Sequence, residues 1–287
     1  MSNLFGSHID SNISDLIINT EKIKKYGGNL VQIFVDPMNK NAKKKDYYNN
    51  FKNYLLENNV KLVVHASYTI NLAKNWTNYS WWITQFILEI ELANKLGAFG
   101  IVIHLGKQLN LSKEESFNNM YTALLYVNSQ TKKNSTTKIF IETSSGQGSE
   151  MCYDLEDFSY FFNKFQKSLN ADLKDRIRIC IDTCHIFSAG YDISDKNKVK
   201  DILLKLENLF GLKNIGLIHL NDSKNPLGSK LDRHANLFEG YITNFGKNND
   251  GIISIISFAK KINIPFVLET PFIDEKIEQE IKKIIKI

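Results

Sequence analysis

Histidine and carboxylate side chains in this sequence gather at the ends of short apolar runs. Imidazole nitrogens interleaved with carboxylate oxygens form the ligand set that zinc and similar divalent ions prefer. Nine residues occupy such run ends or the polar segments just after them: His65, His104, Glu142, Asp182, His185, His219, Asp232, His234 and Glu269. A catalytic zinc ion takes about three protein ligands plus water, so nine candidates imply two or three ions.

Clustered divalent ions are typical of enzymes that cleave phosphodiesters. In displacement at phosphorus, one pair of ions activates water while another ion takes up charge on the departing oxygen. Asp232 and His234 stand two residues apart, which in an extended segment puts both side chains on one side of the chain. We therefore expect a metal-dependent hydrolase that acts on a phosphodiester.

Taken alone, Asp182 and His185 also have a plain structural interpretation. A carboxylate at the end of a strand, three residues before a histidine, is typical of a helix N-cap followed by a buried core histidine. His8 ends an apolar run as well, but it lacks a carboxylate neighbour at ligand spacing. We expect His8 to be structural or to support a ligand residue.

Eight apolar runs provide the elements that must position these residues. We expect strands at Leu4–Ile9, Leu30–Val35, Leu62–Ala66, Gly100–Leu105, Lys138–Thr143, Ile177–Asp182, Ile215–Leu220 and Pro265–Glu269. Segments of helical periodicity lie between them, at about Ser14–Tyr26, Lys45–Asn58, Ser80–Leu96, Lys113–Ser129, Leu155–Leu169, Lys196–Leu209, Gly251–Ile262 and Asp274–Ile287. Strands separated by such helices form parallel pairs, and eight units close into a barrel.

The length of 287 residues suits one (β/α)8 TIM barrel, which we expect to fill residues 1–287 as a single domain of the α/β class. Its active site would lie at the C-terminal ends of the strands. An open doubly wound sheet is the structural alternative, but no GxGxxG follows the first run. The 43% share of hydrophobic residues is ample for a large core, and 23% charged residues with only 4 Pro argue against extended disorder. The net charge of +5 favours a polyanionic partner if the charges cluster.

Targeting signals are missing from the sequence. The first ten residues lack a basic start followed by an apolar run, and no stretch of about eighteen apolar residues occurs. We expect an intracellular protein, in the cytoplasm or nucleus, or in the virion if the source is a large DNA virus. Cys152, Cys180 and Cys184 are odd in number and lack CxxC spacing, so we expect reduced thiols.

Four longer motifs carry a family resemblance. They read HASYTINLA from His65, IETSSGQGS from Ile141, CIDTCHIFSAGYD from Cys180 and LNDSKNPLGSKLDRHANLFEG from Leu220. Together they resemble the endonuclease IV family of apurinic/apyrimidinic (AP) endonucleases, AP endonuclease family 2. The resemblance implies a monomeric barrel with three Zn²⁺ ions that acts in base excision DNA repair. Its substrate would be double-stranded DNA, cut on the 5′ side of an abasic site to leave a 3′-hydroxyl and a 5′-deoxyribose phosphate.

Carried over residue by residue, the family's roles assign all nine candidates. The first ion would take His65, His104 and Glu142; the second Glu142, Asp182, His219 and Glu269; and the third His185, Asp232 and His234. The resemblance implies that a hydroxide bridging the first two ions is the nucleophile, so Glu142 and Glu269 count as catalytic. It also implies that Tyr68 and Thr69 contact the DNA.

Three places depart from the family pattern. Met38 and Asn39 stand where family members usually carry an Arg that enters the DNA, and Thr69 replaces a bulky apolar residue, which predicts weaker wedging into the duplex. Phe238 replaces a Gly, with an expected effect on local loop shape. None of these residues is a ligand candidate, so lesion recognition could differ while metal binding and hydrolysis are kept.

Two other functions stay open. A single-metal sugar isomerase or epimerase of a related barrel would leave four candidates unexplained: His65, His104, Asp232 and His234. A non-catalytic damaged-DNA-binding protein would not need a complete ligand set. One ion per chain would favour the isomerase, and binding without cleavage would favour the binding protein.

Overall fold

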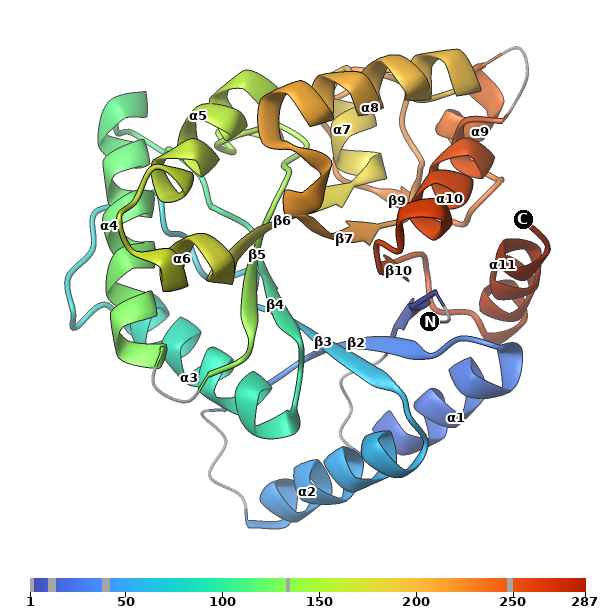
Figure 1. The fold of residues 1–287 in the computed structure, drawn as a ribbon, viewed down its shortest axis with the longest axis horizontal. Coiled ribbons are helices and arrows are strands. Elements are labelled where there is room, and N and C mark those ends of the chain that lie inside the picture. The colour runs from blue at the N-terminus through green and yellow to red at the C-terminus, as the bar shows by residue number, and fades with distance from the viewer. Residues whose placement is uncertain (1–2, 10–13, 38–41, 133–134, 247–249) are drawn as a thin grey trace.

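A computed structural model describes residues 3–9, 14–37, 42–132, 135–246 and 250–287. Its centre is a closed barrel of eight parallel strands: β1 (Phe5–His8), β2 (Leu30–Phe34), β3 (Lys61–His65), β4 (Gly100–Ile103), β5 (Lys138–Glu142), β6 (Ile177–Asp182), β7 (Ile215–His219) and β10 (Phe266–Leu268). Each strand pairs with its neighbour in the chain order, and β1 pairs with β10 to close the ring (Figure 1). The expected TIM barrel is confirmed, and the open sheet is wrong.

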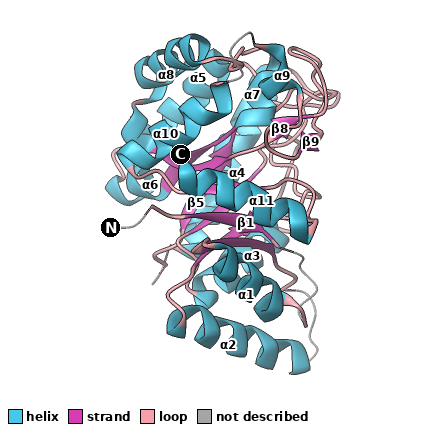
Figure 2. Cartoon of the chain, turned by 90° about the vertical axis from the view of Figure 1, so that its right-hand side faces the viewer, coloured by secondary structure: helices cyan, strands magenta, loops and turns pink. Residues whose placement is uncertain are grey.

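Helices connect the strands and surround the barrel (Figure 2). The long ones are α1 (Leu16–Tyr26), α2 (Ala42–Glu57), α3 (Trp81–Leu96), α4 (Lys113–Thr131), α5 (Leu155–Gln166), α8 (Lys196–Phe210), α10 (Gly251–Ile262) and α11 (Asp274–Lys286). They match the eight expected helices within a few residues. Local signals set their ends: α4 begins at a capping box of Ser112 and Glu115, and α3 ends before Gly97, whose φ is +79°.

Several short elements were not expected from the sequence. They are α6 (Ala171–Arg176), α7 (Thr183–Ala189), a 3-10 turn (Leu212–Asn214), α9 (Tyr241–Phe245) and a small antiparallel hairpin of β8 (Asp222–Ser223) and β9 (His234–Ala235). The hairpin lies beside α7 and α9 (Figure 2). It brings the loop after β7 back toward the mouth of the barrel.

A separate apolar cluster fills the barrel interior. One buried residue from each of seven strands forms it: Leu30, Val63, Val102, Phe140, Cys180, Leu217 and Val267. The largest is Phe140, and glycines make room for its ring. A Cβ atom at Gly100 would lie 2.0 Å from one edge of the ring, and a Cβ atom at Gly216 would lie 2.4 Å from the other. This cluster is the barrel floor on which the polar layer above rests.

Among the described residues, none of the helices combines the length and apolar composition required to cross a bilayer. The three cysteines are buried free thiols.

Candidate metal centre

Strand periodicity places the candidate ligands directly above the barrel floor. Side chains two positions apart on a strand point to the same side. Each barrel-floor residue is followed, two positions later in the chain, by a polar residue. These polar residues are Gln32, His65, His104, Glu142, Asp182, His219 and Glu269. On β1, His8 occupies the equivalent position, two residues after Gly6. The mouth of the barrel is therefore lined by one polar side chain from every strand, six of them predicted ligands.

The first predicted group converges on one carboxylate oxygen. Nε2 of His65 lies 3.5 Å from Oε2 of Glu142, and Nε2 of His104 lies 3.1 Å from the same atom. One donor atom from each residue lies within 4.8 Å of the others. This spacing fits one ion held by two imidazoles and a carboxylate.

The second group uses the other oxygen of the same carboxylate. Nδ1 of His219 lies 2.7 Å from Oε1 of Glu142, 3.0 Å from Oε2 of Glu269 and 3.9 Å from Oδ2 of Asp182. Glu142 thus faces two ligand groups with its two oxygens, which is the geometry that a bridging carboxylate needs.

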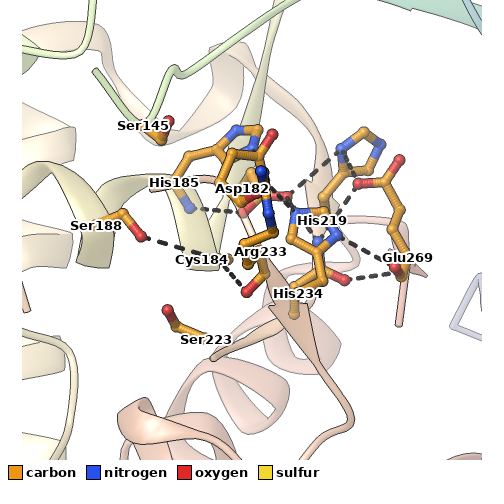
Figure 3. A network of polar contacts seen from close by, with 12 residues as sticks. Ser145, Asp182, Cys184, His185, Ser188, His219, Ser223, Arg233, His234 and Glu269 are labelled. Atoms are coloured by element: carbon orange, nitrogen blue, oxygen red, sulfur yellow. Dashed lines mark hydrogen bonds and ion pairs between the residues drawn. The ribbon is translucent and has the colours of Figure 1, made fainter. Parts of the chain in front are cut away.

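The third group comes from α7 and the hairpin. Oδ1 of Asp232 lies 3.2 Å from Nε2 of His185 and 3.1 Å from Nε2 of His234. Nε2 of His234 also lies 3.6 Å from Oδ2 of Asp182. Figure 3 shows the side chains of Asp182, His185 and His234 directed toward one another, with His219 and Glu269 close by. All nine predicted residues therefore meet in one place, which we call the ligand cluster.

Asp182 is an N-cap residue, and its position is also compatible with the predicted ligand role. Its Oδ1 accepts a hydrogen bond of 2.8 Å from the backbone N–H of His185 and so caps the first turn of α7. Its Oδ2 faces the ligand cluster. The N-cap interpretation and the ligand interpretation are compatible, because they use different oxygens.

The ligand cluster contains buried polar atoms that lack hydrogen-bond partners. Within the described residues these are Nε2 of His65, Nε2 of His185, Nε2 of His234 and Oε2 of Glu142. A buried polar group without a partner costs about 1–3 kcal/mol. Such unpartnered nitrogens beside carboxylates are the donor set that fits divalent cations.

Backbone carbonyl groups set the orientation of three imidazoles. Nδ1 of His65 lies 2.8 Å from the carbonyl oxygen of Ala66, and Nδ1 of His185 lies 2.8 Å from that of Thr143. Nδ1 of His234 lies 3.1 Å from the carbonyl oxygen of Glu269. A carbonyl oxygen only accepts, so Nδ1 carries a proton and Nε2 is the nitrogen that faces the cluster.

Neighbouring charges shift the pKa values of the carboxylates and imidazoles in the ligand cluster. Burial raises the pKa of Glu142, but the imidazoles of His104 and His219 outweigh burial and hold this pKa well below its usual range. Burial lowers the pKa of His234, but the carboxylates of Asp182 and Asp232 raise it to about 9. Protons on these imidazoles therefore compete with a cation for the same nitrogens.

Tyr68 and Thr69, predicted to contact DNA, lie at the rim. Tyr68 is 62% exposed, and its ring centroid lies 5.0 Å from that of His65 and 5.3 Å from that of His104. It lines two cavities of about 340 and 460 Å³, each of which is also lined by residues of the ligand cluster. Thr69 is exposed and its hydroxyl bonds that of Ser67 at 2.7 Å. Met38 and Asn39 lie outside the described residues.

Phe238 adopts a backbone conformation that favours glycine, with φ of +69°. Its ring lies under Nζ of Lys283, 4.9 Å from the ring centroid. A residue with a side chain is strained in this conformation, which is consistent with the Gly that the family resemblance implies at this position.

Two residues that contact the ligands were not predicted. Asn221 donates a 2.6 Å hydrogen bond to Oδ2 of Asp182 and accepts one of 2.8 Å from the backbone N–H of Glu269. Gln32 contacts both His219 and Glu269. Asn and Gln are not typical zinc ligands, so residue type did not single them out. The position of Gln32 could have done so, because it interrupts an apolar strand two residues after Leu30.

Comparison with known proteins extends these observations. A family model described as "Xylose isomerase-like TIM barrel" matches residues 20–287. A relative from Acanthamoeba polyphaga mimivirus that carries the name endonuclease 4 is 33% identical, over 98% of this chain and 90% of its own.

Solved structures match the whole barrel. Endonuclease IV from Thermus thermophilus superposes with a TM-score of 0.75 at 22% identity, covering 99% of this chain and 98% of that chain. A D-tagatose 3-epimerase-like protein superposes with a TM-score of 0.69 at 18% identity, covering 99% and 97%. At these identities the superpositions establish the fold alone. With the matched family model and the 33% identical relative, the chain belongs to the endonuclease IV family of xylose isomerase-like TIM barrels.

Proposed function

We propose that this protein is a zinc-dependent AP endonuclease of base excision repair, which hydrolyses the phosphodiester 5′ to an abasic site in duplex DNA. The products would be a 3′-hydroxyl and a 5′-deoxyribose phosphate. The observation that carries the proposal is the ligand cluster: nine imidazole and carboxylate side chains in three groups, with unpartnered buried donor atoms. The relative named endonuclease 4 supports the same activity.

Three Zn²⁺ ions, when bound, would supply an activated water and would neutralise charge on the phosphate and the departing oxygen. The protein's own residues hold and space these charges. Glu142 offers one oxygen to His65 and His104 and the other to His219, so it fixes the distance between the first two groups. Glu269 completes the second group from the end of β10, the strand that pairs with β7.

Tyr68 is the residue best placed to contact the DNA at the lesion. Its ring is exposed at the edge of the ligand cluster, and Tyr68 lines both cavities. An aromatic ring of this kind can stack on a base beside the abasic gap, which contributes about 1–3 kcal/mol per base. Thr69 beside it offers only a short polar side chain.

A single-metal sugar epimerase is the alternative that the shared fold raises. It would use one metal ion and leave four residues without a role, although their donor atoms face the same cluster: His65, His104, Asp232 and His234. Elemental analysis separates the two functions, because three zinc ions per chain are expected for the nuclease and one ion for the epimerase.

The direct test is incubation of the purified protein with a DNA duplex that carries one abasic site. We expect a single cut on its 5′ side, with a 3′-hydroxyl found by polymerase extension, and no cut in a matched duplex without the lesion. Binding without cleavage under every divalent ion would instead indicate a damaged-DNA-binding protein. A cut on the 3′ side would overturn the proposed reaction.

A further inference from the structure

Gln32 is a fully buried amide in the middle of the polar layer. Its Oε1 lies 2.9 Å from Nε2 of His219, and its Nε2 donates a 2.6 Å hydrogen bond to Oε1 of Glu269. The same Nε2 lies 3.2 Å from Nδ1 of His8. Gln32 therefore joins β1, β2, β7 and the end of β10 through side chains alone.

The partners of Gln32 fix which way its amide points. A carboxylate only accepts, so the NH₂ group must face Glu269 and the oxygen must face His219. The oxygen in turn requires a proton on Nε2 of His219. That tautomer leaves Nδ1 as the nitrogen directed at Glu142 and Glu269, at 2.7 and 3.0 Å.

His219 is thus oriented differently from three other histidines of the cluster. His65, His185 and His234 each point Nδ1 at a backbone carbonyl, which no substitution of a side chain removes. His219 instead depends on a side chain, and the same side chain holds Glu269. One substitution can therefore release two candidate ligands of the second group.

We propose that Gln32 is a positioning residue for the second metal ion: it fixes the Nε2–H tautomer of His219 and the rotamer of Glu269, so that both present lone pairs to one cation. This inference rests on the proposed metal-dependent function. Partners that orient a ligand in this way typically change metal affinity by about 10–100-fold when removed.

The test compares Gln32→Leu with a matched control, Thr20→Val. Thr20 is equally buried but lies in α1, where its hydroxyl donates to the carbonyl of Leu16, away from the ligand cluster. Zinc is removed from wild type and both variants, and zinc affinities are measured by competition with a chromophoric chelator. We expect one of three sites to weaken by about 10–100-fold in Gln32→Leu and none in Thr20→Val.

A second measurement uses wild-type protein only, so it does not depend on how well Gln32→Leu folds. Long-range ¹H–¹⁵N spectra of the zinc-loaded protein report the tautomer of each histidine, and His219 should carry its proton on Nε2. A proton on Nδ1 of His219, or three wild-type affinities in folded Gln32→Leu, would overturn the inference. Zinc binding as expected without incision of abasic DNA would overturn the proposed function instead and leave the role of Gln32 intact.

Discussion

Gly100→Ala places a methyl group against the ring of Phe140 and should lower the free energy of unfolding. Most of this loss should disappear when Phe140→Ala removes the ring. The added Cβ would lie 2.0 Å from the ring, closer than real Cβ contacts. The ring cannot move aside, because its other edge lies against Gly216. Since Phe140 is in the barrel floor two residues before Glu142, this packing also bears on the ligand cluster above it.

The expected changes in unfolding free energy follow from two effects, overpacking of the barrel floor and a cavity in it. Overfilling the floor with Gly100→Ala should cost about 1–3 kcal/mol of unfolding free energy. Phe140→Ala empties a site that is 2% exposed, which should cost about 3–5 kcal/mol. In the double variant the new methyl group enters the space left by the ring, so we expect a favourable coupling of about 1–3 kcal/mol.

Equilibrium urea unfolding of the metal-stripped proteins measures this cycle. Gly97→Ala is the control, because its Cβ would meet nothing within 4 Å and its cost in unfolding free energy comes only from the φ of +79°. Its cost should be unchanged by Phe140→Ala. Costs for Gly100→Ala and Phe140→Ala that add within about 0.5 kcal/mol would refute the packing argument.

Four further predictions concern the ligand cluster and the rim. Purified protein should incise abasic DNA without added magnesium and lose activity to a strong chelator, since its ligands come from several strands and enclose the ion; activity that survives complete zinc removal would contradict this. Glu142→Gln should abolish incision with a modest loss of stability, because the neutral amide loses the charge shared by two ligand groups, and near-normal incision would rule out that role. On an inactive Glu142→Gln background, Tyr68→Ala should weaken binding to abasic duplex by about 10-fold or more, and Thr69→Leu should tighten it. The affinity should fall markedly as the salt concentration rises. Equal affinities for all variants and no dependence on salt would show that other residues recognise the lesion. The pKa of His234 is raised to about 9, so the stabilisation that its protonated form gives to the metal-stripped protein is complete below pH 6.5 and is lost as pH rises toward 9. The urea midpoint should therefore be lower at pH 9 than at pH 6.5. A His234→Gln variant should show a smaller difference between the two midpoints.

Most of the barrel could be predicted because its strands are short apolar runs that end in charged or polar residues. The same pattern indicated the ligands, since Glu142 and His219 each close a run two residues beyond a floor position. The short elements α6, α7 and α9 were missed because five to seven residues are too few for a helical period to be recognised.

Gln32 and Asn221 could not be identified from residue type. Their amides are not typical metal ligands, and their importance depends on contacts with residues far along the chain, such as Glu269. Phe238 shows the opposite case. The sequence showed that Phe238 departs from the Gly of the resembled family. The positive φ of Phe238 and its contact with Lys283 could be seen only in the structure.

The pairing of β1 with β10 has a consequence for when the site can form. Ser7 aligns with Leu268 across this seam, and Gln32 bonds Glu269 just beyond it. A chain still being synthesised lacks β10 until translation has passed Leu268, so until then its barrel is open and its second ligand group has neither Glu269 nor a fixed His219. The ligand cluster can therefore be assembled only after residues 5–269 have all been made and β1 has met β10.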